Sequence, residues 1–237
     1  MQTKNSTILW LTIFGIAMGF LETAVVIYLR RIYYPDGFKF PLVEIENGIL
    51  SVEILREVAT IIMLFAIGFL AGKTKLQRFA FFIYSFAIWD IFYYVFLKMF
   101  LDWPESLLTP DILFLIPVPW IGPVIAPIIL SLSMIILSWS IIRYDECNKP
   151  GTLKGKDWKI LIAGSLIVII SFMLNFVKSV EEMIMSSVFI DSIALEIIDS
   201  NFGPLNWILF SFGELIIVFE IFKILRMKRM ISVIPKL

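Results

Sequence analysis

The sequence predicts an all-α membrane protein, a polytopic bundle of about six transmembrane helices, one of them broken by prolines, with a further amphipathic helix at the membrane surface. Of the 237 residues, 59% are hydrophobic, and the mean hydropathy is +0.92. A soluble domain of this size cannot bury so much apolar surface. The apolar residues also gather in runs of about 20, the length that a helix needs to cross a bilayer. One integral membrane domain over residues 1–237 follows.

The composition excludes several kinds of chemistry. The chain has no histidine, a single cysteine and a formal net charge of +0. The absence of histidine excludes Ser-His-Asp triads and histidine-based zinc, haem and non-haem iron sites. The neutral charge gives no basic footprint for nucleic acid. We therefore predict no metal site, no cofactor and no nucleic-acid partner. Carboxylates that hold Mg²⁺ stay an open alternative, although no DxxxD-type pair supports it.

The first predicted span covers residues 8–29. Gly15 and Gly19 form a small-residue pair that lets a neighbouring helix come close, and Glu22 follows on nearly the same side. We therefore expect Glu22 to face protein rather than lipid. Two roles stay open for this residue, a protonated packing group or a member of a polar site.

The second predicted span covers residues 51–72 and begins with a charged turn. Glu53 and Arg56 are three residues apart, and Glu57 is their neighbour on the same face. An arginine between two carboxylates is either a self-neutralising structural group or part of a polar site.

The third predicted span covers residues 79–101 and carries a polar stripe. Asp90, Tyr94 and Lys98 recur every four residues, so they lie on one side of a helix. A carboxylate near the middle of a membrane helix costs about 2.5–3.5 kcal/mol on insertion scales. Asp90 should therefore face protein or water, either in a substrate, ion or proton site or as a structural residue held by hydroxyl groups or a lysine.

The fourth predicted span, residues 112–142, is broken. Thr109, Pro110 and Asp111 resemble a helix start, with a cap, a proline at the first helical position and an acid near the positive end of the helix. A short helix over residues 112–116 should end at the following prolines, because they lack N–H groups and disfavour helix before them. A second helix should begin near Trp120. The residues of the break are Pro117, Pro119, Pro123 and Pro127.

The broken backbone needs partners at membrane depth. Non-helical backbone is tolerated there only where protein or water satisfies its polar groups. We therefore expect residues 116–120 to be non-helical, to pack against the second and third spans, and to line a cavity or lie at the membrane surface. Trp103 and Trp120 fit an interfacial aromatic belt.

The last part of the chain predicts two more spans, residues 160–177 and 205–225. Residues 180–198 are too charged to cross a membrane, yet their apolar residues recur at helical spacing. An interfacial amphipathic helix is the expected structure there.

The charge distribution predicts an orientation and a pocket. Lysine and arginine gather at the start, in residues 73–78 and 143–159, and in the tail, which places both termini in the cytoplasm. The remaining loops are then outside and hold most of the acids. Six acids lie at the outer halves of the first four spans, and these are Glu22, Glu53, Glu57, Asp90, Glu105 and Asp111. They indicate a charged, water-accessible pocket there, or else ion pairs at an outer interface without a pocket. The expected pocket residues are Glu22, Arg56, Glu57, Asp90, Tyr94, Lys98, Glu105, Asp111 and Trp120.

Three runs of the sequence carry a family resemblance: WDIFYY at 89–94, WPESLLT at 103–109 and IPVPWIGP at 116–123. Together with FLE at 20–22 and LRE at 55–57, they resemble a group of uncharacterised bacterial and archaeal multi-pass membrane proteins. The resemblance covers the first four spans and implies a multi-pass protein in the cell membrane of a prokaryote. It implies no activity, because none is assigned to that group.

Three functions fit these observations. The preferred one is a small transporter or channel-like protein, because a broken helix beside buried carboxylates is a common way to expose carbonyl groups to a solute. The second is a membrane-embedded enzyme acting on a lipid or isoprenoid, with Asp or Glu as acid or base and with Tyr94 and Arg56 holding an anionic group. The third is a non-catalytic subunit or assembly partner of a membrane complex. The expected partners are accordingly membrane lipid, a small-molecule or ion substrate, or another membrane protein.

Overall fold

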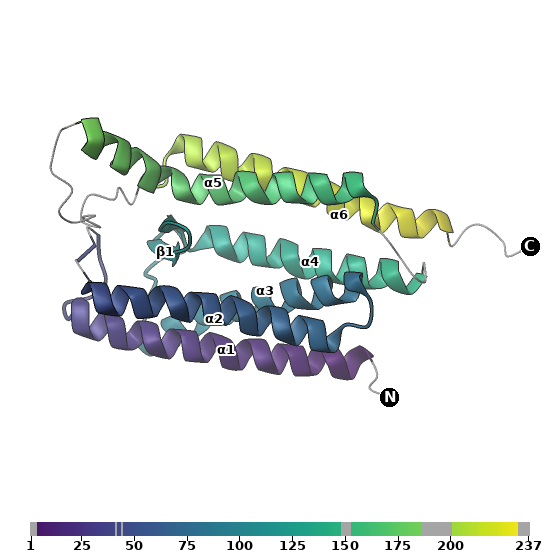
Figure 1. Ribbon diagram of the computed structural model, residues 1–237, viewed down its shortest axis with the longest axis horizontal. Helices are drawn as coiled ribbons and strands as arrows, with labels where there is room; N and C mark the ends of the chain where they lie inside the picture. Colours follow the sequence, from purple (N-terminus) through teal and green to yellow (C-terminus); the bar gives the residue numbers. More distant parts are fainter. Residues whose placement is uncertain (1–3, 41, 44, 148–152, 186–200, 232–237) are drawn as a thin grey trace, which may run out of the picture.

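A computed structural model of the chain describes residues 4–40, 42–43, 45–147, 153–185 and 201–231. Within these ranges the fold is an all-α bundle of long, roughly aligned helices with one short β-hairpin (Figure 1). The elements are α1 Lys4–Tyr33, α2 Asn47–Ala71, α3 Lys75–Leu101, β1 Pro110–Phe114, β2 Trp120–Pro123, α4 Ile125–Cys147, α5 Gly155–Met185 and α6 Pro204–Ile231.

Five of the described helices, α1 to α5, are long and apolar enough to cross a membrane. Their outward faces carry many exposed large hydrophobic side chains, such as Leu55 at 67% and Leu70 at 79% exposure. The prediction of a membrane protein built from helices is confirmed at this level. A sixth span in α6 stays a prediction.

Helix α3 organises the first half of the bundle. It contacts α1, α2 and α4, while α4 also contacts α6, and α6 pairs along α5 (Figure 1). The contact with α1 is close at Gly19, where a β-carbon would lie 2.9 Å from the Trp89 carbonyl oxygen. The small-residue pair of the first span thus packs against α3 and directs Glu22 toward the bundle interior.

The contact between α2 and α3 depends in the same way on Gly68. A β-carbon at Gly68 would lie 2.7 Å from the Phe82 backbone nitrogen, so Gly68→Ala forces the helices apart. We expect this variant to lose about 1–3 kcal/mol of unfolding free energy, measured by thermal unfolding in detergent. Gly48→Ala on the same helix is the matched control, because its β-carbon would meet nothing closer than 3.8 Å. Equal stability of the two variants would contradict the close contact.

The broken fourth span is a β-hairpin, which corrects the sequence prediction. Residues 110–114 form strand β1 rather than a helix, and α4 begins at Ile125 rather than near Trp120. The strands pair antiparallel, with Asp111 opposite Gly122. The hairpin is physically favoured because the prolines that cannot continue a helix lie in its turn and strand ends, while the remaining N–H and C=O groups pair across the strands.

The hairpin also revises the roles of the individual prolines. Pro117 lies in the exposed turn and Pro119 just before β2. Pro123 ends β2, and Pro127 lies in the first turn of α4. A proline is tolerated in the first turn of a helix because its missing N–H would have no intrahelical partner there. No bend of α4 at Pro127 is needed.

The hairpin is held at its base and on one face. The Val124 N–H donates to the Thr109 carbonyl (3.1 Å), and the Ile125 N–H donates to the Leu107 carbonyl (2.8 Å). Thr109 therefore closes a loop before β1 instead of capping a helix. On the face toward α5, the Trp120 ring stacks on Phe172. Trp120 is thus partly buried and packs against the bundle core. Its place in an interfacial belt stays a prediction.

The fifth helix is longer than predicted. Helix α5 continues through residues 178–185, where the sequence indicated the end of a span and the start of a separate interfacial helix. Helical backbone hydrogen bonds therefore continue across the charged residues at 181 and 182. The rest of the predicted interfacial helix, residues 186–198, lies outside the described residues.

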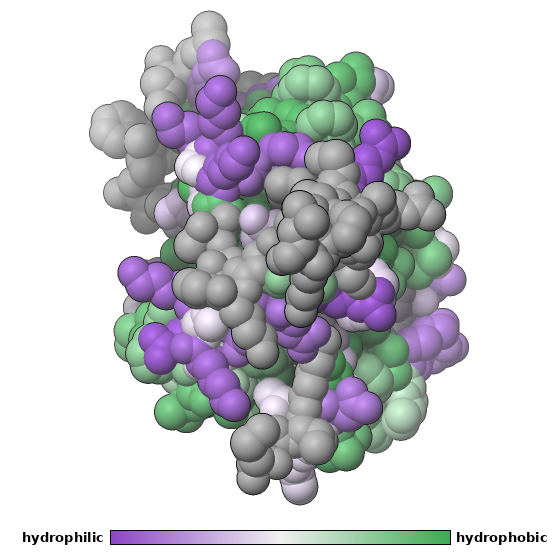
Figure 2. All heavy atoms as spheres, turned by 90° about the vertical axis from the view of Figure 1, so that its right-hand side faces the viewer, coloured by the Kyte–Doolittle hydropathy of each residue, from purple (hydrophilic) through white to green (hydrophobic). Residues whose placement is uncertain are grey.

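The two ends of the bundle differ in charge. The end that holds the start of α1, the α2–α3 connection and the start of α5 carries exposed lysines, and we call it the basic end; these lysines are Lys73, Lys75, Lys154, Lys156 and Lys159. Figure 2 faces this end and shows hydrophilic side chains gathered on it, with hydrophobic side chains around them. The opposite end, which holds the hairpin and the start of α2, is the hairpin end (Figure 1).

Candidate functional site

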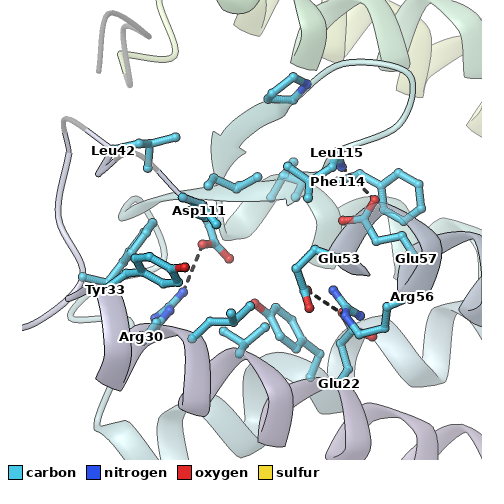
Figure 3. Close-up of a pocket in the computed structure, with 18 of the residues that line it drawn as sticks. Glu22, Arg30, Tyr33, Leu42, Glu53, Arg56, Glu57, Asp111, Phe114 and Leu115 are labelled. Carbon is cyan, nitrogen blue, oxygen red and sulfur yellow. Dashed lines mark hydrogen bonds and ion pairs between the residues drawn. The ribbon is translucent and has the colours of Figure 1, made fainter. Parts of the chain in front are cut away.

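A cavity of about 130 Å³ lies at the hairpin end, enclosed by α1, α2, α3 and β1 (Figure 3). The segment after α1 covers part of it, with Leu42 and the exposed Val43 in its lining. Most of the lining is apolar or aromatic, for example Val26, Leu29 and Phe114. Into this apolar lining the surrounding elements place seven charged side chains.

The first charged group joins α1 to α2. Arg56 donates through Nε to Glu53 (2.8 Å) and forms a short ion pair with Glu22 on α1 (Figure 3). The three side chains are 8–20% exposed. Arg56 is therefore neutralised within the protein and fixes α1 against α2 at this side of the cavity.

The second charged group joins α1 to the hairpin. An Arg30 Nη2 atom lies 3.1 Å from Asp111 Oδ1, and both side chains are almost fully buried. The guanidinium also lies over the rings of Phe38 (4.3 Å) and Trp103 (3.8 Å), in two cation–π contacts. Figure 3 shows the Asp111 carboxylate reaching from the hairpin into the cavity with one oxygen toward Arg30.

Two further carboxyl groups in the lining have only neutral hydrogen-bond donors. Asp90 accepts from the Ser131 hydroxyl on α4 (2.8 Å), and Glu57 accepts from the Leu115 N–H at the end of β1 (2.9 Å). Within the described part of the chain, neither carboxyl forms an ion pair with a lysine or arginine. The cavity thus combines five carboxyl groups with two guanidinium groups; these are Glu22, Glu53, Glu57, Asp90 and Asp111, with Arg30 and Arg56.

The structure brings together six of the nine residues that the sequence indicated for a pocket. They are Glu22, Arg56, Glu57, Asp90, Tyr94 and Asp111. In particular, Asp90 and Glu22, which come from different helices, line the same cavity.

The other three predicted residues lie elsewhere. Lys98 is exposed, pairs with Asp102 (2.7 Å) and donates to the Pro104 carbonyl, so it caps the end of α3. Glu105 is exposed in the loop before β1. Trp120 contacts Phe114 and Phe172 on the side of the hairpin toward α5. None of the three belongs to the cavity lining.

Sequence reasoning left several lining residues out. Arg30 carries charge into the cavity, and Trp89 is 6% exposed and lines it. Glu53, which belongs to the outer acidic cluster of the sequence, lines the cavity as well. Trp103, expected at the membrane interface, is buried against Arg30. The sequence did hold a signal for Arg30, because this arginine lies on the side of the membrane that the charge rule leaves poor in basic residues.

The described residues contain no group of three or more His, Cys, Asp or Glu side chains placed to hold a metal ion. The arginines at Glu22, Glu53 and Asp111 occupy the positions where a cation would neutralise those carboxylates.

No family model, curated protein or solved structure matches this chain.

Proposed function

We propose that this protein is a small membrane transporter whose substrate site is the cavity at the hairpin end. The supporting observation is the cavity itself, in which an apolar and aromatic lining holds seven charged side chains from three helices and a hairpin. Such a lining suits a small molecule that has both an apolar and a polar part. The β-hairpin interrupts the helical packing beside the cavity, as broken helices do at transporter substrate sites.

The proposal includes an orientation in the cell membrane of a prokaryote. With six spans, both termini lie on the basic side, which the positive-inside rule assigns to the cytoplasm. The cavity then opens toward the outer side. The exposed lysines of the basic end and the acidic hairpin end support this orientation.

Reporter fusions test the orientation. Fusions at Lys154 and Leu237 should report a cytoplasmic position, and a fusion at Pro104 an outer one. A cytoplasmic reading at Pro104 would reverse the orientation and place the cavity on the inner side.

Transport itself is tested in proteoliposomes. We expect saturable, protein-dependent uptake of at least one solute from a panel of small cationic, neutral and anionic molecules that each carry an apolar group. Val26→Trp, which fills the cavity, should abolish the uptake. Uptake of none of the panel, or uptake that is unchanged in the filled variant, would contradict the proposal.

One observation favours the second candidate, a membrane-embedded acid–base enzyme. Asp90 and Glu57 are carboxyl groups without an ionic partner in the described residues, in a lining that also contains Tyr93 and Tyr94. Such carboxyl groups can transfer protons. Conversion of a lipid or isoprenoid by the purified protein, lost in Asp90→Asn, would favour the enzyme over the transporter.

A further inference from the structure

The cavity lining contains more carboxyl groups than guanidinium groups. Asp90 and Asp111 line the same cavity, and Arg30 forms an ion pair with Asp111 but not with Asp90. On the other side, Glu57 adds a third carboxyl to the pair that Arg56 already neutralises. A carboxylate in an apolar environment requires a cation or a proton.

Asp111 also offers a free acceptor. Its Oδ2 atom has no hydrogen-bond partner among the described residues, although the side chain is only 3% exposed. Asp90 lines the same cavity and, among the described residues, accepts a hydrogen bond only from the Ser131 hydroxyl. Two carboxyl groups with spare acceptor capacity and one excess negative charge form a site for a hydrogen-bond donor that carries a positive charge.

The rest of the lining suits an organic cation better than a metal ion. Trp89, Tyr93, Tyr94 and Phe114 place aromatic rings around the cavity, and aromatic faces attract ammonium groups. Apolar side chains such as Val26 can contact the body of the ligand.

We propose that the substrate is a small primary amine with an apolar or aromatic body, bound as an ammonium ion at Asp90 and Asp111 in exchange for a proton. This inference rests on the proposed function of the cavity as a substrate site. In the empty cavity the Asp90 carboxyl carries a proton. When the ammonium ion binds, the Asp90 proton is released to solvent. The resulting carboxylate accepts a hydrogen bond from an N–H group of the ligand. One positive charge enters and one leaves.

Other charged and titratable groups surround this exchange. The electrostatic potential in the cavity is set by Arg30 and Glu22 on α1 together with the charged side chains of α2. The groups that face the cavity are Glu22, Arg30, Tyr33, Tyr34, Glu53, Arg56, Glu57, Tyr93, Tyr94 and Asp111. Asp90 and Glu57 are the lining carboxyls that form no ion pair in the described part of the chain. Glu57 accepts from a backbone N–H, whereas Asp90 accepts only from the Ser131 hydroxyl, so Asp90 is the carboxyl expected to exchange its proton.

Calorimetry on the purified full-length protein tests the proposal with three matched probes, benzylamine, benzyl alcohol and benzoate. We expect benzylamine to bind at least about tenfold more tightly than benzyl alcohol, and benzoate not to bind. Titrations in buffers of different ionisation enthalpy should show about one proton released for each benzylamine bound. Because one proton released corresponds to about tenfold in affinity per pH unit, the affinity should weaken by well over about tenfold between about pH 7.5 and about pH 5.5.

Two variants test whether Asp90 is the carboxyl that exchanges its proton for the ammonium ion. Asp90→Asn should lose the proton release and at least about tenfold in affinity. Glu105→Gln, an exposed carboxyl at the same end outside the lining, should change neither. Equal binding of benzyl alcohol, tighter binding of benzoate, or no proton release by the wild type would overturn the proposal, and these three results need no variant.

The outcome is separable from that of the proposed function. Saturable transport of neutral or anionic solutes alone would support a transporter and overturn the amine substrate. Benzylamine binding with proton release, but no transport of any solute, would support the amine site and contradict the transporter.

Discussion

Replacing Asp111 by Asn should lower the unfolding free energy by about 3–5 kcal/mol, the usual cost of breaking a buried ion pair from one side. The change leaves the Arg30 guanidinium buried without its counter-ion. A guanidinium cannot lose its proton in a protein, so the charge stays in the bundle. The measurement is unfolding in detergent followed by circular dichroism at about pH 7.

Arg30→Met provides the comparison. It removes the cation and its contacts with Phe38 and Trp103, but the remaining carboxyl can take up a proton. We expect a smaller loss, about 1–3 kcal/mol. The double variant Arg30→Met, Asp111→Asn should recover most of the stability lost in Asp111→Asn, because no uncompensated charge remains. A double variant no more stable than Asp111→Asn would show that the ion pair does not link α1 to the hairpin.

Filling the cavity should have the largest effect on function. Val26 lies on α1 in the lining, and Val26→Trp places an indole into a space of about 130 Å³. We expect loss of substrate binding and transport to below about 1% of the wild-type rate, while the helix content stays unchanged. The measurement is uptake in proteoliposomes at matched protein content.

Leu21→Trp is the matched control for this variant. Leu21 lies on the same helix, is 60% exposed and does not line the cavity. The same substitution there should leave transport within about twofold of the wild type. Equal loss in both variants would indicate a general effect of tryptophan on α1, and no loss in Val26→Trp would remove the cavity from the mechanism.

The helices were predictable from the sequence because a long apolar run can satisfy its backbone hydrogen bonds in a bilayer only by forming a helix. The polar stripe was predictable in part. Asp90 and Tyr94 lie at the level of the cavity, but Lys98 is eight residues from Asp90, about 12 Å along the helix, and reaches the exposed end of α3 instead. The four-residue spacing predicts which face of the helix carries the polar residues. It does not predict how far along the helix the cavity extends.

The hairpin could not be read from local sequence. Thr109, Pro110 and Asp111 have the residue types of a helix start, and strand β1 is only five residues long. Its structure depends on pairing with β2 and on packing of Trp120 against Phe172 of α5, which are contacts between distant parts of the chain. The partner of Arg30 could not be predicted for the same reason, since Asp111 lies 81 residues away.

Cysteine accessibility tests most directly the claim that the cavity is a binding site open to the outer side. The natural Cys147 is exposed at the basic end, so in the proposed orientation it serves as the control for the cytoplasmic side. Val26→Cys is introduced into the wild type and into a Cys147→Ser background. A small, membrane-impermeant, cationic thiosulfonate added to intact cells should modify position 26 and not position 147, whereas inside-out vesicles should show the reverse. Benzylamine should slow the modification of position 26. Labelling of position 26 only from the inside, or no labelling from either side, would contradict the account.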